Sequence, residues 1–285
     1  MKILVLGTSE MFGNAVALYL ASVGHEVTGM AQKRNPFFNS VIVDYLNFDA
    51  VKEVIQSGSY HAVINCSALL IKESETDKSR AILMNSYLPN FLAEITKDTK
   101  TMIVHRSTDC IFSGKLGKYS ETAFPDALEF YGKTKALGEL NDNKNLTLRT
   151  SIIGPDFNQK GDSLLNWFLQ QEGPIKGYSK AMWTGVSSLV FAKAADAGIN
   201  KRLTGLVNLV NGQSISKHDL LQLFNKYFRH NKLVINAYDN VVQDKSLINT
   251  RQDFNFVVPS YEEMVKEMAE WCQSHQDIYP DYYKF

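Results

Sequence analysis

A few residues in one stretch of the chain have the types and the spacing that proton transfer to a carbonyl group requires. Tyr131 is followed by Lys135, and an α-helix brings residues four apart onto the same face. A free phenol has a pKa of about 10, and a neighbouring cation lowers it toward neutrality, as general acid–base catalysis requires. A hydroxyl from Thr108 or Ser107 could hold the carbonyl oxygen against this phenol. The pattern predicts an acid catalyst that acts on a carbonyl substrate.

The Tyr-x-x-x-Lys spacing alone also fits an ordinary helix with an exposed tyrosine and a solvated lysine. Two features of the chain favour the catalytic interpretation. An apolar run from Met102 to Val104 is soon followed by Ser107-Thr108-Asp109, which is typical of a buried strand with hydroxyls at its carboxyl end. The second feature is a glycine turn close to the N-terminus.

The glycine turn follows the apolar run Lys2–Leu6 and precedes a helical pattern that ends at Gly24. A helix that starts behind such a turn can receive a pyrophosphate at its N-terminus. Glu10 stands where the extended dinucleotide fingerprint has a glycine, so a carboxylate lies where backbone usually meets phosphate. By itself the turn is as compatible with helix capping as with nucleotide binding. The residues expected to line the cofactor in this turn are Gly7, Ser9, Glu10, Met11, Phe12 and Gly13.

The residues after the second predicted strand, at 25–30, bear on the choice of cofactor. NAD-binding folds often end this strand with an acidic residue that binds the ribose 2′-hydroxyl. Here Lys33 and Arg34 follow instead, which favours a 2′-phosphate and therefore NADP (NADPH), with NAD as the alternative. A solvent-exposed loop with no role in cofactor binding could also carry these two cations. Asp44 is expected to cap a turn or to contact the adenine.

Strands alternate with helices from Met1 to Thr150, which indicates an α/β fold of the Rossmann type with a doubly wound parallel sheet. Strands are expected at 2–6, 25–30, 40–43, 61–64, 101–106 and 146–149, with helices at 51–55 and 78–97 among them. Ligands bind beyond the carboxyl ends of such strands. The residues that fall there are the glycine turn, Asp44, the small residues Cys66, Ser67 and Ala68, and Thr108 with Asp109.

After residue 150 the pattern changes. We expect a NAD(P)-binding domain over residues 1–150 and a smaller mixed α/β substrate-binding region over residues 151–285, from which the chain could cross back into the first domain. Helices are predicted at 164–170, 187–199, 218–228 and 261–274, strands at 206–210 and 233–236, and an irregular segment with Trp183 at 173–185. The cleft between the two parts is the expected ligand site.

Composition argues against several kinds of partner. Thirty basic and thirty acidic residues give a formal net charge of zero, so we expect no nucleic acid and no membrane surface as partner. No apolar run is long enough to span a bilayer, and the N-terminus is typical of a first strand rather than a signal peptide. Three cysteines and six histidines show no disulfide or metal-ligand spacing. We expect a cytoplasmic, reduced protein that needs no metal.

Taken together, these motifs resemble the extended short-chain dehydrogenase/reductases, and within them the dTDP-4-dehydrorhamnose reductase type. The likeness covers the first half of the chain well and the second half loosely, at 183–185 and 205–209. The segments that carry it in the first half are the glycine turn, Asn65-Cys66-Ser67-Ala68, Met84-Asn85, Ser107-Thr108-Asp109-Cys110-Ile111-Phe112, Tyr131-Gly132-Lys133-Thr134-Lys135, Gly138-Glu139 and Leu148-Arg149-Thr150.

The resemblance implies a role for each matching residue. Tyr131 would protonate the carbonyl oxygen, Lys135 would lower its pKa and bind the nicotinamide ribose, and Thr108 would orient the carbonyl. The implied reaction is hydride transfer from NADPH to the C4 ketone of a nucleotide-linked 4-keto-6-deoxy sugar, in the synthesis of cell-surface polysaccharide precursors. The implied cofactor contacts include Gly7, Gly13, Asp44, Ala68 and Asn85, and the implied substrate contacts are Thr108, Asp109, Tyr131 and Trp183.

Two other functions stay open on the same fold. An NAD-dependent sugar-nucleotide epimerase would retain and recycle its cofactor, although no acidic residue follows the second strand. A non-catalytic regulatory subunit, similar to the accessory subunit of a methionine adenosyltransferase, would not need a tuned phenol. Cys110 stands where related dehydratases have a glutamate, and Asp109 where fucose-synthase-like enzymes have a cysteine, so a plain reductase fits best. Whether the protein forms a homodimer is also open.

Overall fold

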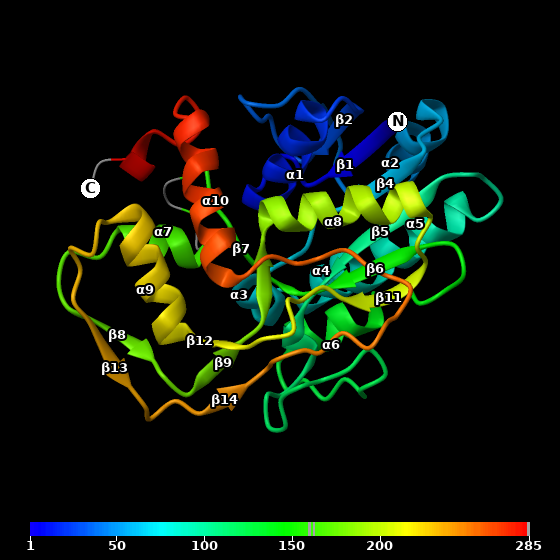
Figure 1. Ribbon diagram of the computed structural model, residues 1–285. Coiled ribbons are helices and arrows are strands. Elements are labelled where there is room, and N and C mark those ends of the chain that lie inside the picture. Colours follow the sequence, from blue (N-terminus) through cyan, green and yellow to red (C-terminus); the bar gives the residue numbers. More distant parts are fainter. Residues whose placement is uncertain (159–160, 162, 284–285) are drawn as a thin grey trace.

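Seven parallel strands form the central sheet of the protein (Figure 1). The computed structural model describes residues 1–158, 161 and 163–283. The strand order is β11-β6-β5-β4-β1-β2-β3, so the chain winds outward from β1 in both directions and the predicted Rossmann-type fold is confirmed. The strands are β1 Lys2–Leu6, β2 Glu26–Ala31, β3 Ser40–Ile42, β4 Ala62–Asn65, β5 Met102–Ser107, β6 Leu146–Arg149 and β11 Gly205–Asn208.

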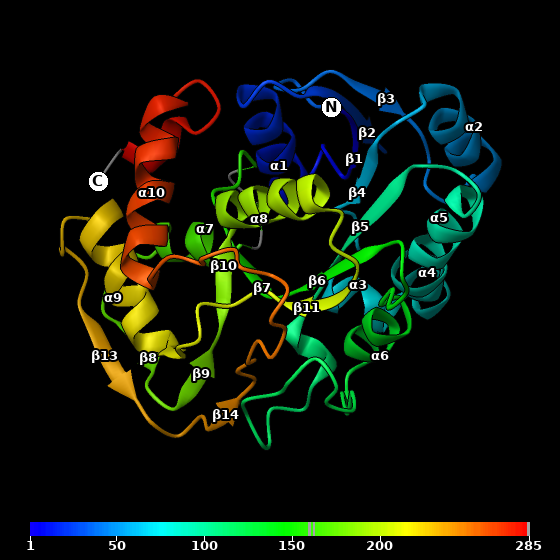
Figure 2. The ribbon, with the colours of Figure 1, turned by 45° about the vertical axis from the view of Figure 1, so that its right-hand side comes forward.

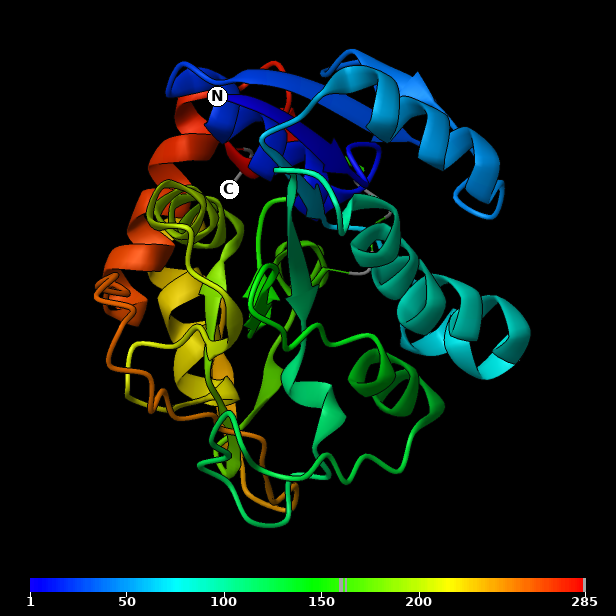
Figure 3. The same cartoon turned by 90° about the vertical axis from the view of Figure 1, so that its right-hand side faces the viewer.

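The central strands are apolar on both faces because helices cover both. Ile3 and Val5 of β1 join one core cluster, and Leu4 and Leu6 join another. Side chains alternate between the two faces of a strand, so a strand buried on both faces is a nearly continuous apolar run. Figure 3 shows the helices on either side of the sheet. They are α1 Met11–Ser22 and α8 Ser188–Lys201 with the first cluster, and α2 Phe48–Gly58 and α5 Leu88–Thr96 with the second.

The segment predicted as one helix at 78–97 consists of three pieces. Helix α4 (Lys78–Ala81) leads into the π-helical segment η1 (Ile82–Tyr87), and α5 follows it. A further helix that was not predicted, α3 (Ile71–Thr76), precedes them. Short π-helical segments often occur at functional sites, and here the segment contains Asn85.

The chain after β6 builds a smaller lobe and also returns to the main sheet (Figure 2). The strand predicted at 206–210 as part of the second region is β11, which instead pairs with β6. Helix α8 likewise packs against α1. The lobe itself contains α7 Leu164–Leu169, α9 Lys217–Phe228 and α10 Tyr261–Ser274, and η3 Pro280–Tyr283 is the last element that the structure describes. None of the described helices is long and apolar enough to cross a membrane.

The segment 173–185, predicted as irregular, holds two short strands and the first residue of a third, and all three pair with distant parts of the chain. Strand β8 (Ile175–Tyr178) pairs with β13 (Ile235–Tyr238). Because the partners are far away in sequence, local sequence patterns do not predict these pairings. The remaining short strands are β7 Ser151–Ile153, β9 Ala181–Trp183, β10 Gly185–Ser187, β12 Ile215–Ser216 and β14 Gln243–Asp244.

Candidate active site

The glycine turn joins β1 to α1 in a conformation that favours glycine. Gly7 has a φ of 90°, and a Cβ on Gly13 would lie 2.3 Å from the carbonyl oxygen of Gly7, so larger residues would strain both positions. The Gly7 amide donates a 2.7 Å hydrogen bond to the hydroxyl of Tyr45, which donates one of 2.7 Å to the carbonyl oxygen of Met30. Tyr45, which the sequence pattern did not single out, therefore anchors the turn.

The surroundings of this turn fit a dinucleotide. No side chain caps the N-terminus of α1, so its first amides can bind an anion. A Cβ on Gly7 would lie 3.1 Å from the backbone nitrogen of Ser67, and Cys66, Ser67 and Ala68 are all buried. The Nε of Arg106 is buried and has no hydrogen-bond partner in the described part of the chain, which also favours an anionic ligand. A pyrophosphate would therefore be held by the α1 amides with Arg106 beside them.

The residues predicted for the adenosine end of the cofactor lie at the same edge of the sheet. Lys33 and Arg34 follow β2 and are exposed. The carboxylate of Asp44 accepts hydrogen bonds from the amide of Leu46 at 3.1 Å and from the side chain of Gln32 at 3.2 Å. Asp44 thus caps the turn before α2, and its contact with an adenine stays a prediction.

Thr108 and Tyr131 are brought together where α6 (Phe130–Leu137) packs on η2 (Asp109–Ile111). A Cβ on Gly132 would lie 2.1 Å from the carbonyl oxygen of Cys110, so glycine permits this close approach. The Thr108 hydroxyl accepts a 3.2 Å hydrogen bond from the Cys110 amide and donates one of 3.3 Å to Asp109. The geometry puts the predicted orienting hydroxyl beside the predicted acid.

Burial raises the pKa of Tyr131 to about 12, against the opposing effects of the Arg106 charge and the Thr108 hydroxyl. Arg106, not Lys135, is the strongest positive charge acting on the phenol. Asp109 is also buried, and burial raises its pKa, while Lys245 and Lys217 of the second lobe pull it back down. The site is therefore buried, and positive charges from both lobes act on its titratable groups.

Lys135 is fully buried beneath the end of β5. Its ammonium donates a 2.8 Å hydrogen bond to the carbonyl oxygen of Arg106 and lies 3.3 Å from Nε2 of His105. Nδ1 of His105 in turn lies 3.3 Å from the side-chain nitrogen of Asn65. Burial and the charge of Arg106 hold the pKa of Lys135 well below its ordinary value, partly offset by Glu139. The polar pair His105 and Arg106, unusual for a central strand, thus surrounds this lysine.

Asn85 and Trp183 have protein partners in the structure. The Asn85 side chain bonds the backbone of Leu69 at 2.8 and 3.0 Å and the hydroxyl of Thr134 at 3.1 Å, so it fixes α6 against the loop after β4. Trp183 is buried, with its ring centroid 5.7 Å from that of Tyr261. The predicted contacts of Asn85 with cofactor and of Trp183 with substrate stay predictions.

A buried ion pair behind the site was not anticipated from the sequence. The carboxylate of Glu139 receives hydrogen bonds from Nε and a terminal nitrogen of Arg149, both at 2.7 Å, and from the Ser107 hydroxyl at 2.6 Å. The pair supports the strand end that carries Thr108. Its only sequence signal was Arg149 at the end of a buried strand.

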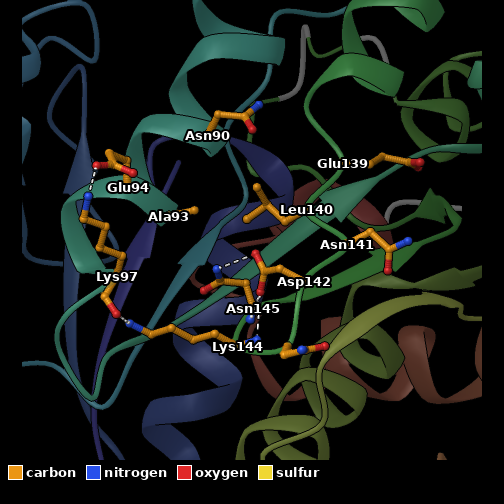
Figure 4. Close-up of a pocket in the computed structure, with 11 residues that line it drawn as sticks. Asn90, Ala93, Glu94, Lys97, Glu139, Leu140, Asn141, Asp142, Lys144 and Asn145 are labelled. Atoms are coloured by element: carbon orange, nitrogen blue, oxygen red, sulfur yellow. Dashed lines mark hydrogen bonds and ion pairs between the residues drawn. The ribbon is translucent and has the colours of Figure 1, made fainter.

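Glu139 also lines a surface pocket between α5 and the segment that leads into β6 (Figure 4). There Lys144 donates hydrogen bonds to the carbonyl oxygens of Lys97 and Thr99, at 3.0 and 2.9 Å, at the end of α5. This pocket lies at the amino end of β6, whereas Thr108 lies beyond the carboxyl end of β5, so the pocket is separate from the candidate active site.

The profile of the family described as RmlD substrate binding domain matches residues 1–173, more than half of the chain. The chain belongs to this family. The expected relationship to the dTDP-4-dehydrorhamnose reductase type is thereby confirmed. Over 94% of its length the chain is 26% identical to the dTDP-4-dehydrorhamnose reductase of Salmonella typhimurium, of which it covers 97%.

Other relatives match over shorter stretches. The chain is 30% identical over 139 residues to the probable low-salt glycan biosynthesis reductase Agl14 of Haloferax volcanii, covering 47% of this chain and 46% of that protein. It is 28% identical to the methionine adenosyltransferase 2 subunit beta of Xenopus laevis, over 57% of this chain and 50% of that protein. The match thus spans about half the length of these two relatives.

A solved structure confirms the fold. The dTDP-4-dehydrorhamnose reductase of Bacillus anthracis, in complex with NADP, has a TM-score of 0.79 to this chain at 19% identity, and the match covers 94% of this chain and 98% of that one. At this identity the likeness supports the arrangement of the elements and not a residue's role.

Proposed function

We propose that the protein is an NADPH-dependent reductase that transfers hydride to the C4 ketone of a nucleotide-linked 4-keto-6-deoxy sugar. The observation that carries the proposal is the position of Thr108 beside Tyr131, with Lys135 under the same strand end and the glycine turn along the same edge of the sheet. The match of a dTDP-4-dehydrorhamnose reductase to nearly the whole chain supports it.

In this reaction the cofactor supplies the hydride, and the protein supplies position and a proton. Tyr131 donates its hydroxyl proton to the carbonyl oxygen, and the Thr108 hydroxyl donates a hydrogen bond to the same oxygen. The positive charge of Arg106 stabilises the phenolate that remains, and Lys135 is proposed to assist it. Because the pocket is buried, these charges act more strongly than they would in water.

NADPH is proposed over NADH because two exposed cations, Lys33 and Arg34, follow β2 where a 2′-phosphate is expected. The NADP in the related Bacillus anthracis structure supports this choice. We also propose that the enzyme acts in the cytoplasm, on precursors of cell-surface polysaccharide. A homodimer stays a prediction.

The test is to mix NADPH and the protein with a panel of nucleotide-linked 4-keto sugars and to follow the nicotinamide absorbance. Oxidation with one member of the panel would support the reductase and identify its substrate. Tight binding of cofactor without oxidation would favour an epimerase or a regulatory subunit. Failure to bind either NADPH or NADH would contradict all three functions that depend on the cofactor site.

A further inference from the structure

Glu10 and Arg106 bring opposite charges to the cofactor edge of the sheet from two different elements. Glu10 is the residue before α1, and Arg106 is the penultimate residue of β5. The guanidinium carbon of Arg106 lies 5.0 Å from the ring centroid of Phe12, the second residue of α1. This contact places the guanidinium beside the start of α1, where a pyrophosphate would lie.

Within residues 1–158, 161 and 163–283, the guanidinium of Arg106 has no hydrogen-bond or ion-pair partner. The Nε atom of this guanidinium is buried. A buried donor without a partner costs free energy, and phosphate oxygens are strong acceptors for a guanidinium. The position of Arg106 is therefore one that an anionic ligand would stabilise.

Glu10, the residue before α1, contributes a carboxylate that interacts electrostatically with Arg106. The charged and titratable groups that face Glu10 from the surrounding elements are Arg106, Lys33, Asp156, Tyr45 and Cys66, and the Ser67 hydroxyl lies beside it. Burial raises the pKa of Glu10 to about 7, since it outweighs the attraction of Arg106 and Lys33. The carboxylate is thus charged in part of the molecules near neutral pH.

We propose that Arg106 is a counterion for the pyrophosphate of the dinucleotide and that Glu10 must be protonated for the dinucleotide to bind tightly. This rests on the proposed use of a nicotinamide dinucleotide. In the free protein the guanidinium is attracted to Glu10. A pyrophosphate at the N-terminus of α1 repels a carboxylate there. Glu10 therefore takes up a proton from solvent, and the guanidinium of Arg106 interacts with the phosphate oxygens instead.

The test is calorimetric titration of the full-length protein with NADPH at about pH 6 and about pH 8, in two buffers of different ionisation enthalpy, which counts the protons taken up. For the wild type we expect binding to weaken about tenfold per pH unit above the pKa of Glu10, with uptake of up to about one proton. Glu10→Gln, which has nearly the same shape, should keep only the pH dependence that NADPH itself contributes.

The 2′-phosphate of NADPH also titrates, so the difference between wild type and Glu10→Gln is the quantity that reports on Glu10. Glu53→Gln, an exposed acid on α2, is the matched control and should behave as wild type. Arg106→Gln should weaken binding at both pH values by about tenfold or more.

The proposal would be overturned if NADPH binding by Glu10→Gln had the same pH dependence and proton uptake as binding by the wild type. It would also be overturned if Arg106→Gln bound NADPH as tightly as the wild type. If neither the wild type nor Glu10→Gln binds NADPH at either pH, the proposed function falls and this inference falls with it. Tight binding of NADPH by Glu10→Gln at about pH 8, where the wild type binds weakly, would give the proposal its strongest support.

Discussion

The ammonium of Lys135 donates a 2.8 Å hydrogen bond to the carbonyl oxygen of Arg106. The bond ties α6 to the end of β5, so the helix that carries Tyr131 and the strand that leads to Thr108 are held in one arrangement. The lysine therefore has a positioning role in addition to its charge. Its burial means that this arrangement is maintained at a cost in stability.

Lys135→Met is expected to lower turnover without lowering stability. The folded protein holds the pKa of Lys135 well below that of the unfolded chain, so the unfolded chain binds more protons, and stability rises with pH up to the unfolded value. Removing the buried cation should leave the free energy of unfolding unchanged or raise it by about 1–2 kcal/mol, because an apolar side chain replaces a desolvated charge. Turnover should fall by about 100-fold or more.

Urea unfolding at neutral pH and steady-state kinetics measure the two effects of Lys135→Met. Lys133→Met, an exposed lysine on the same helix, should leave both turnover and stability unchanged. A loss of more than about 2 kcal/mol in Lys135→Met would contradict the expectation that the buried charge is unfavourable.

Tyr131→Phe is expected to abolish most of the turnover while cofactor binding persists. The substitution removes the proton donor, and general acid catalysis accounts for about 10²- to 10⁴-fold in rate. NADPH affinity by fluorescence titration should stay within about threefold of wild type, because the ring keeps its packing. Tyr87→Phe, at an exposed tyrosine, serves as the control. Normal turnover in Tyr131→Phe would show that Tyr131 is not the proton donor.

Glu139→Gln is expected to destabilise the fold strongly. The Arg149 side chain is only 2% exposed, and a buried charge that loses its partner costs about 3–5 kcal/mol. The double variant Glu139→Leu with Arg149→Met should lose less than the sum of its single variants, because no charge is left unpaired. Chemical unfolding of all variants gives the coupling energy, and simple additivity would show that the ion pair contributes nothing specific.

Asn85→Ala is expected to lower the free energy of unfolding by about 1–2 kcal/mol, since it leaves partly buried backbone groups of Leu69 without their hydrogen bonds to Asn85. Because Asn85 also binds Thr134 of α6, turnover should fall as well. Asn143→Ala, at an exposed asparagine, is the control. A stable Asn85→Ala that has lost only cofactor affinity would instead support the direct cofactor contact.

The sequence alone was sufficient for most of the main sheet and for the elements that carry Thr108, Tyr131 and Lys135. Six of the seven sheet strands were predicted in the first half, because a strand buried on both faces must be a local apolar run, and the hydroxyls and glycines stand at strand ends that a parallel sheet brings to one edge. The family resemblance followed from the same local segments.

Tertiary structure decided the contacts between segments that are distant in sequence. β11 returns to pair with β6, Tyr45 holds the amide of Gly7, and Glu139 joins Arg149. Lys135 bonds the backbone of β5, and the charges of Glu10 and Arg106 come close enough to attract each other. Periodicity reports only which side of an element is buried, so partners of this kind become visible only once the chain has packed.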